Sequence, residues 1–555
     1  MKSLTIYIYA AFFALLAFSC ADLDEAPKDR IVSSSIFQDQ ELVLQYLYHI
    51  YSSMPCGYGA MAFGTAPQTA INTGMGITDL LDGSTDLLRS RAGWNESNSV
   101  IIPGGMSAQW NPHDVWGQRY AAIRKCNHML VNLATSGFSD DFKNRIAAEV
   151  RFLRAYMYSD LVRRYGDVPL IVELQDVNNL EEMQVPRDPV SDIYDFIERE
   201  LEAIGAEDGG LPSAENLPPS QLGRVTREAA LALGGRAMLY AERYEKSAWF
   251  SKQVIDRGIF SLVDNYNALF QSKGGETSEV LFEVLYDGVN KGHSADFLYM
   301  PFSLDNGWGN QTCPTQELVD SYEMLDGTPF DWSNPEHAAN PYENRDKRLQ
   351  WSIIVDGATF KNTVIRTAYR TTSDGLGMNE GTNTGYILRK FLDETIPFEK
   401  LAINYLGSST SWKEIRYAEV LLNYAEAQNE AVGADESVYN AMEVVRRRAG
   451  LGGTLPAGLD QAGMRERIRH ERKVELAFEG HRFWDIRRWR IAEELLHGKR
   501  FHGIKITEND NVKNYEVFEI TTSPVQVFLP KHYLMPINFN ELAKNPKLGP
   551  NNEGY

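Results

Sequence analysis

Three glutamates four residues apart have the spacing in this sequence that most directly suggests chemistry. Glu471, Glu475 and Glu479 would share one face of a helix, because residues four apart are neighbours on a helix surface. Carboxylates placed in this way lie roughly 5 Å apart, the separation that a retaining glycosidase needs. A general acid also needs a raised pKa, and neighbouring arginines would lower it. The pattern therefore favours a buried ion-pair network over a catalytic pair.

The stretch that carries these glutamates, Met464–Arg490, is predicted to be an amphipathic helix. It contains no proline and only one glycine, Gly480, and its apolar residues recur at roughly helical spacing. Arginines surround the glutamates, and Phe483, Trp484 and Trp489 add large apolar surface. An arginine can hold two carboxylate oxygens at once, so the predicted network would fix the orientation of this helix.

Other catalytic and metal-binding motifs are not found. The sequence has no P-loop, no Gly-x-Ser-x-Gly and no His-Glu-x-x-His. Its 4 cysteines form no Cys-x-x-Cys pair, which argues against a zinc or redox motif. The polar loop Asp374–Asn383 could supply oxygen ligands to calcium, although such loops are more often plain turns. We therefore expect no cofactor, with a structural calcium ion as the one alternative.

Composition narrows the classes of partner. The 555 residues carry a formal net charge of -20, which opposes binding to nucleic acid or to an anionic membrane face. Aromatic residues make up 11% of the chain, with 27 tyrosines and 10 tryptophans. The chain is long enough for a large core, and rings left at its surface could stack on a ligand.

Met1–Ser19 has the features of a secretory signal peptide. Lys2 is followed by an uncharged, mostly apolar run, Leu4–Phe18, which is short for a membrane-spanning helix. The run ends at Cys20 after a small residue, as in a lipoprotein box. Cys20 is therefore predicted to be acylated, with residues 20–35 as a lipidated tether. The alternative is an ordinary secretory signal cut nearby.

Paired helices are predicted in both halves of the chain, from apolar periodicity and from small residues that permit close helix approach. The fold class is mainly α: a single domain, 36–555, built on a platform of tetratricopeptide-like helix pairs. We divide it into an N-terminal helical part, an irregular insertion and a C-terminal helical part, at residues 36–260, 261–411 and 412–555. Helices are expected within 36–52, 114–173, 189–205, 226–258 and 412–450.

Two irregular regions carry tryptophans in polar, glycine-rich settings. Residues 53–111 have little periodicity, and a loop region of this length is usually functional. Residues 261–411 mix loops with short strand-like runs at 280–286 and 351–355. Trp94 and Trp308 each follow a glycine, so each could offer a flat face to a sugar ring while nearby Asn and Asp bond its hydroxyls. Either ring could instead be a plug over the edge of the core.

Several blocks of the sequence resemble the SusD/RagB family, cell-surface nutrient-binding lipoproteins of Gram-negative bacteria. ERKVELAFEGHRFWDIRRW resembles the C-terminal signature of that family. The resemblance extends over nearly the whole mature chain, and blocks this long are specific. Other matching blocks are RFLRAYMYSDLVRRYGDVPL, TQELVDSYEMLDGTPF, EIRYAEVLLNYAEAQNE and LMPINFNELAKNPKL.

The resemblance implies a helical body with four tetratricopeptide-like helix pairs that supports an irregular binding region. It implies a lipid anchor at Cys20, on the outer face of the outer membrane. Family members form a lid over a SusC-like TonB-dependent transporter and capture oligosaccharides, or in some members peptides, without catalysis. We therefore expect a non-enzymatic glycan-binding lipoprotein. A peptide-binding lipoprotein and a glycan-cleaving enzyme are the alternatives.

Ligand contacts in the family lie in variable loops rather than in the shared blocks, so individual residues align poorly. Trp308 precedes the TQELVD block, where family members often carry a stacking residue. Trp94 lies in the first loop region, which often contributes to binding. Four weaker candidates follow from the same argument: Tyr299, Asn306, Asp79 and Arg89.

Overall fold

The fold is described by a computed structural model that covers most of the chain after the N-terminal segment. The predicted signal peptide, the lipidation site Cys20 and the tether 20–35 lie outside the described residues, as does Asn306. Within the described part, no helix is both long enough and apolar enough to cross a bilayer. The described residues are 36–55, 57–58, 79–276, 278–305, 307–403, 406–510 and 512–555.

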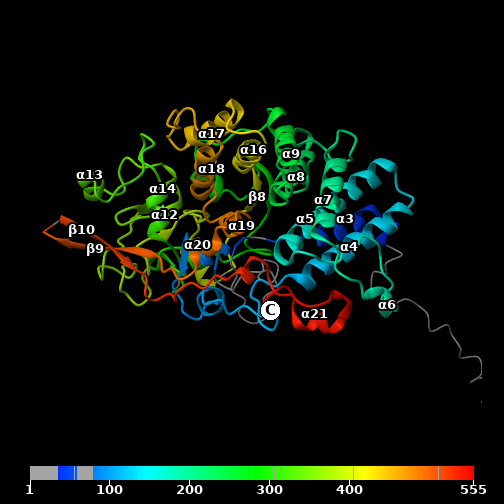
Figure 1. The fold of residues 1–555 in the computed structure, drawn as a ribbon, viewed down its shortest axis with the longest axis horizontal. Helices are drawn as coiled ribbons and strands as arrows, with labels where there is room; N and C mark the ends of the chain where they lie inside the picture. Colours follow the sequence, from blue (N-terminus) through cyan, green and yellow to red (C-terminus); the bar gives the residue numbers. More distant parts are fainter. Residues whose placement is uncertain are drawn as a thin grey trace, which may run out of the picture.

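Most of the regular structure is helical, which confirms the predicted fold class (Figure 1). The longer helices fall inside the segments that apolar periodicity had marked. The helices are α3 (Gln40–Tyr51), α4 (Trp116–Ala134), α5 (Asp140–Tyr165), α6 (Leu180–Met183), α7 (Val190–Gly205), α8 (Arg227–Tyr240), α9 (Tyr244–Asp256), α10 (Tyr266–Gln271), α11 (Ala295–Tyr299), α12 (Gln316–Ser321), α13 (Pro335–Ala339), α14 (Arg348–Ser352), α15 (Phe398–Ile403), α16 (Tyr417–Ala431), α17 (Glu436–Arg448), α18 (Gln461–Glu475), α19 (His481–Arg488), α20 (Ala492–Leu496) and α21 (Phe539–Lys544).

Small residues let neighbouring helices approach closely, as the pair α8 and α9 shows. A Cβ atom added at Gly234 of α8 would lie 2.6 Å from the ring of Phe250 on α9.

The ends of the helices are set by capping residues, as α5 shows. The Ser139 hydroxyl caps the start of α5 by accepting a hydrogen bond from the Phe142 N–H, and Gly166, with φ of 73°, ends it.

The helices form one continuous row that joins the two halves of the chain. Along it, α4 packs on α5, α5 on α7, α7 on α8 and α8 on α9. The next neighbour of α9 is α16, which in turn contacts α17 and α18. Figure 1 shows α16 between α9 and α18, so segments far apart in sequence lie side by side. The predicted row of helix pairs is therefore present, and its continuity depends on contacts between the N-terminal and C-terminal helical parts.

The strands are short and pair in twos, and most pairs join distant segments. The predicted runs at 280–286 and 351–355 contain β2 and β4. The five pairings within the described ranges are antiparallel: β1 (Leu88–Ser90) with β3 (Thr312–Pro314), β2 (Val280–Val284) with β8 (Trp412–Arg416), β4 (Ile353–Ile354) with β7 (Ile387–Leu388), β5 (Thr359–Phe360) with β6 (Thr363–Val364), and β9 (His502–Asn509) with β10 (Val512–Glu519).

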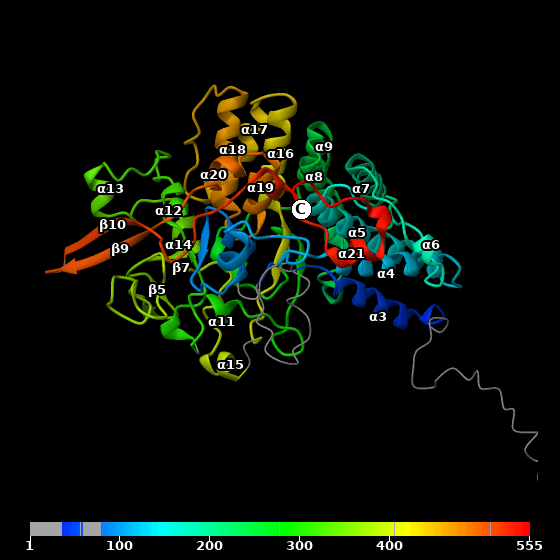
Figure 2. The same cartoon turned by 60° about the horizontal axis from the view of Figure 1, so that its bottom comes forward.

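The hairpin of β9 and β10 lies in the part that the sequence predicted to be helical. It projects from the end of the molecule opposite α4 to α7 (Figures 1 and 2). Ile504 and Ile506 point into the core from β9, whereas residues of the hairpin near its tip are exposed. This two-residue alternation is typical of a strand with one buried face.

The Met464–Arg490 stretch is not one helix, so that prediction is wrong. Helix α18 ends at Glu475, a turn follows, and α19 begins at His481. Phe478 and Gly480 have φ of 72° and 80°, a left-handed conformation that a helix cannot continue through. Glu479 therefore lies in the turn rather than on the face shared by Glu471 and Glu475.

Candidate functional site

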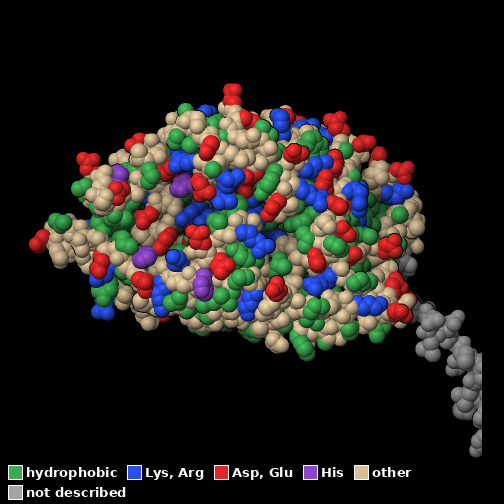
Figure 3. Space-filling model, in the orientation of Figure 1, with side chains coloured by type: hydrophobic (Ala, Val, Ile, Leu, Met, Phe, Trp, Pro, Cys, Tyr) green, Lys and Arg blue, Asp and Glu red, His purple; other side chains and the backbone are tan. Residues whose placement is uncertain are grey.

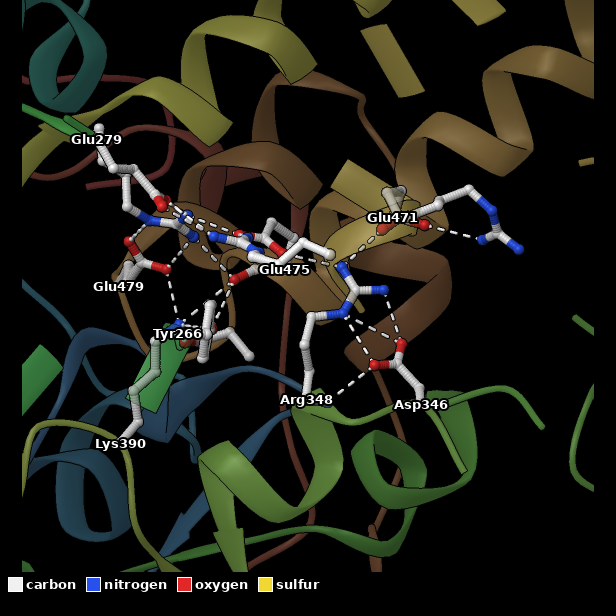
Figure 4. Close-up of polar contacts among 12 residues, drawn as sticks. Tyr266, Glu279, Asp346, Arg348, Lys390, Glu471, Glu475 and Glu479 are labelled. Carbon is white, nitrogen blue, oxygen red and sulfur yellow. Dashed lines mark hydrogen bonds and ion pairs between the residues drawn. The ribbon is translucent and has the colours of Figure 1, made fainter. Parts of the chain in front are cut away.

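The three glutamates are buried inside the fold. Figure 4 shows them among the polar side chains that they contact. Glu475 accepts hydrogen bonds from Arg416 at 2.6 Å, Arg348 at 2.9 Å and also Arg448. Its neighbour in the turn, Glu479, bonds the same Arg416 through both carboxylate oxygens at 2.6 and 2.7 Å. Arg416 therefore bridges the end of α18 and the turn that follows.

These contacts extend into a network of ion pairs that balances its charges among the described residues. We call it the buried ion-pair network. The nearby arginines hold the pKa of Glu475 well below its ordinary value, against the effect of burial, and lower that of Glu471 as well. Its members are Arg348, Lys390, Arg416, Arg446, Arg448 and Arg467 with Glu279, Glu323, Asp346, Glu471, Glu475 and Glu479.

A buried carboxylate held ionised in this way cannot serve as the general acid of a glycosidase. That role needs a protonated carboxyl near neutral pH and access to the glycosidic oxygen. Glu471 and Glu475 have neither, since both are fully buried and paired with arginine. The network instead holds α18 and the following turn against β8, α14 and α17, which confirms its structural interpretation.

Trp94 and Trp308 come together at the surface from two separate loops. Their ring centroids are 6.2 Å apart and their planes meet at 77°. Trp94 is 56% exposed, whereas Trp308 is half-buried and packs beside Phe297, with ring centroids 6.3 Å apart. We call the two tryptophans the aromatic platform. Its outer ring is open to solvent, and its inner ring is fixed against the core.

Hydrogen bonds fix the turn that carries Trp308. The Asp305 carboxylate accepts bonds from the backbone N–H groups of Gly307 and Trp308, the latter at 3.1 Å. Gln311 donates from its side chain to the Trp308 carbonyl at 2.7 Å. Burial raises the pKa of Asp305 to about 7. The inner ring of the platform therefore rests on a preformed turn.

A third loop, residues 374–383, lies beside the platform and connects its two parts. Asn310 donates from its side chain to the Glu380 carbonyl at 3.3 Å, and Asn383 donates to the Ser90 carbonyl at 3.0 Å. Arg91, three residues before Trp94, forms an ion pair with Glu380 at 2.6 Å. Loops from three distant parts of the sequence therefore converge at this surface.

The same third loop was the candidate calcium site. The Asp374 carboxylate accepts hydrogen bonds from the backbone and hydroxyl of Ser303 and from Asn310. Among the described residues, no group of three or more His, Cys, Asp or Glu side chains is arranged to hold a metal ion. Asp374 acts in this structure as a support for the segment that leads to Trp308.

Three of the weaker sequence candidates lie beneath the surface. Tyr299 is 0% exposed, at the end of α11, and Asp79 and Arg89 are buried as well. Arg89 belongs to β1, donates to Gln526 at 2.8 Å and lies over the Phe501 ring. In this conformation none of the three reaches a ligand at the surface. Their segments looked like exposed loops in the sequence but pack into the core, in the case of Arg89 because β1 pairs with the distant β3.

Comparison with known proteins adds an independent observation. A family model described as the SusD family matches residues 278–555. The chain belongs to the SusD family. A second model, described as "Starch-binding associating with outer membrane", matches residues 60–239. The expected SusD/RagB resemblance is thereby confirmed over both halves of the chain.

Individual SusD-like proteins are similar over almost the full length. SusD-like protein P2 of Formosa agariphila is 27% identical over 558 residues, with 97% of each chain covered. A SusD-like protein of Bacteroides fragilis has a TM-score of 0.77 and 28% identity, covering 96% of this chain and 100% of that one. A SusD-like carbohydrate binding protein of the same species has a TM-score of 0.77 and 26% identity, covering 93% and 100%.

In this SusD-family chain, the blocks that carry the resemblance do not form the aromatic platform. The signature around Glu475 lies in the core, whereas Trp94 and Trp308 lie in loops. Sequence reasoning missed Arg91, Glu380 and Phe297, which hold or back the platform. No local pattern marks these residues, because their roles depend on which loops meet in space.

Proposed function

We propose that this protein is a lipid-anchored protein of the outer-membrane cell surface that binds an oligosaccharide at the aromatic platform. It then delivers the sugar to a SusC-like TonB-dependent transporter without cleaving it. The observation that carries this proposal is the meeting of Trp94 and Trp308, one ring open and one fixed. Membership of the SusD family supports it, as does the carbohydrate binding of a similar protein of Bacteroides fragilis.

The platform offers what a sugar ring needs. The exposed face of Trp94 can stack on the C–H face of a pyranose, a contact worth about 1 kcal/mol beyond area burial by analogy with aromatic pairs. Polar groups lie next to it, since Arg91, Asn379 and Glu380 interact with one another at its side. The exposed Asn379 side chain can exchange hydrogen bonds with sugar hydroxyls.

Binding should be reversible and of modest affinity. A sugar on a surface platform buries little apolar area, and association itself has an entropic cost. The platform lowers part of that cost, because Trp308 is held in place by hydrogen bonds before any ligand arrives. Reversible capture suits a protein that must release its cargo to a transporter.

The net negative charge of the chain makes nucleic acid a poor candidate for its partner. Acidic and basic side chains are interspersed over the face drawn in Figure 3, and the chain carries a formal net charge of -20. Nucleic acid requires a positive surface that neutralises its phosphates. A neutral glycan carries no such requirement, so its recognition can depend on stacking and hydrogen bonds.

The proposal is tested by calorimetric titration of residues 21–555 with a panel of oligosaccharides and peptides, followed by product analysis. We expect saturable binding of one glycan class without cleavage. Trp94→Ala and Trp308→Ala should weaken it, while Trp249→Ala should not, since that 40% exposed ring lies on α9 in the helical row. Equal binding by wild type and both platform variants would show that the platform is not the site.

The other functions appear as outcomes of the same titration. Binding of peptides in place of sugars would identify a peptide-binding lipoprotein and leave the tryptophans as surface plugs. Shortened glycans after incubation would identify an enzyme, with its carboxylates outside the buried ion-pair network.

A further inference from the structure

Glu380 contacts both loops that carry the aromatic platform. Its carboxylate pairs with Arg91, three residues before Trp94, at 2.6 Å. Its backbone carbonyl accepts a hydrogen bond from Asn310, two residues after Trp308, at 3.3 Å. One residue of the third loop therefore bonds to both aromatic loops.

The Arg91 side chain is the charged part of this connection. Besides the ion pair, its Nη1 donates a hydrogen bond to the Asn379 carbonyl at 3.2 Å. The side chain therefore bonds to two successive residues of the third loop. The backbone N–H of Arg91 donates to the Gln311 carbonyl at 2.9 Å, which ties it to the Trp308 loop as well. Displacing this side chain would release the Trp94 loop from the third loop on one side.

The loop that bears Trp94 is also held by hydrogen bonds within the loop itself. Asn98 donates from its side chain to the carbonyls of Ser90 and Ala92, at 2.9 and 3.0 Å. The Ser99 hydroxyl donates to the Asn95 carbonyl at 2.9 Å. These bonds are internal to the loop and fix its shape. The ion pair adds a side-chain contact between this loop and the third loop, beyond the backbone pairing of β1 with β3 and the Arg91 N–H bond to Gln311.

We propose that Arg91 and Glu380 are positioning residues that hold Trp94 at its angle to Trp308, so that glycan affinity depends on their ion pair. The inference rests on the proposed function and deepens it. The side chains of Arg91 and Glu380 are 16% and 35% exposed. An ion pair that reaches solvent is screened by salt, so glycan affinity should fall as ionic strength rises.

If the ion pair only positions the platform loops, the stability of the whole protein should hardly depend on it. Partly exposed ion pairs contribute little to global stability, so removal of this pair should leave the melting temperature nearly unchanged. The effect should appear in the dissociation constant, because the pair orders only the platform loops. An exchange of charges should restore binding, whereas a role in folding alone would give no link between charge sign and affinity.

The test measures the dissociation constant for the best glycan of the panel, in wild type, Arg91→Met, Glu380→Gln and the charge exchange Arg91→Glu with Glu380→Arg. We expect each single variant to bind about two- to fivefold more weakly, the range of a partly exposed pair, with recovery in the exchange. Between about 0.02 and 0.5 M salt, wild-type affinity should fall and that of Glu380→Gln should stay flat. Asp256→Asn, which removes an exposed pair with Lys252 on α9, is the matched control.

A ligand-free measurement separates this inference from the proposed function. With 5-fluorotryptophan incorporated, the fluorine resonance of Trp94 can be assigned by its absence in Trp94→Phe. We expect this resonance to shift in Glu380→Gln and to return in the charge exchange. If wild type binds no glycan but the resonance shifts, the proposed function fails while the positioning role stands. Unchanged affinity and an unchanged resonance in Glu380→Gln would overturn the positioning role.

Discussion

Replacing Glu475 by glutamine should destabilise the protein by about 3–5 kcal/mol, the usual cost of breaking a buried ion pair. Glu475 is fully buried and contacts Arg348, Arg416 and Arg448. The substitution keeps the shape of the side chain but removes one negative charge. The buried ion-pair network, balanced among the described residues, would then hold one uncompensated positive charge.

The size of this destabilisation depends on which other carboxylates pair with the arginines that contact Glu475. Each arginine keeps another carboxylate: Arg348 keeps Asp346, Arg416 keeps Glu479 and Arg448 keeps Glu279. No guanidinium is left wholly unpaired, and the glutamine carbonyl oxygen can still accept hydrogen bonds through its two lone pairs. Complete loss of folding is therefore not expected. Even so, the cost is a large part of the roughly 5–15 kcal/mol that stabilises a typical domain.

Urea unfolding followed by tryptophan fluorescence measures this difference. Glu430→Gln is the matched control, because Glu430 pairs with Arg465 at 2.5 Å near the surface, where loss of the pair should cost only about 0–1 kcal/mol. Equal unfolding midpoints for the two variants would refute the argument from burial and charge. Loss of a glycan-cleaving activity at unchanged stability would instead restore the catalytic interpretation of these glutamates.

Two further predictions concern buried Asp82 and the turn at Gly480. Burial raises the pKa of Asp82 to about 7. An acid with a raised folded-state pKa loses stability as pH rises from its unfolded pKa to its folded pKa, so Asp82→Asn should flatten the pH dependence of unfolding between about pH 4 and 7; an unchanged slope would contradict this. Gly480→Ala should cost about 1–2 kcal/mol in thermal unfolding, since φ is 80° and the nearest side-chain atom to the new Cβ lies at 3.6 Å. Gly117→Ala, in open space on α4, should not destabilise, and equal melting temperatures would disprove the strain.

Local patterns predicted the helices well because their causes are local. Thr226 and Asp435 accept hydrogen bonds from the first turns of α8 and α17, as capping residues do. The break after Glu475 was missed, because apolar periodicity continues through it while Phe478 takes a left-handed conformation. That conformation is held by the packing of the turn, which no local signal records. The proposed boundaries of the three parts stay a prediction.

The site was harder to predict, because exposure depends on the whole fold. Trp94 and Trp308 stay predicted ligand contacts, and the sequence could not show that they converge, because their loops meet only in space. Tyr299 and Arg89 were weaker candidates from the same two irregular regions, and both are buried. Composition cannot separate these cases, since the pairing of β1 with β3 decides what lies inside.

The contact between α9 and α16 has a consequence for the order of folding. A chain is made from its N-terminus, so the residues of α4 to α9 become available to fold before Tyr417–Ala431. Until then the side of α9 that α16 will cover has no neighbour, and apolar surface stays open to other chains. Contacts so distant in sequence also form slowly. The half-made protein should therefore be the stage most prone to aggregation, and the arrival of α16 the event that ends it.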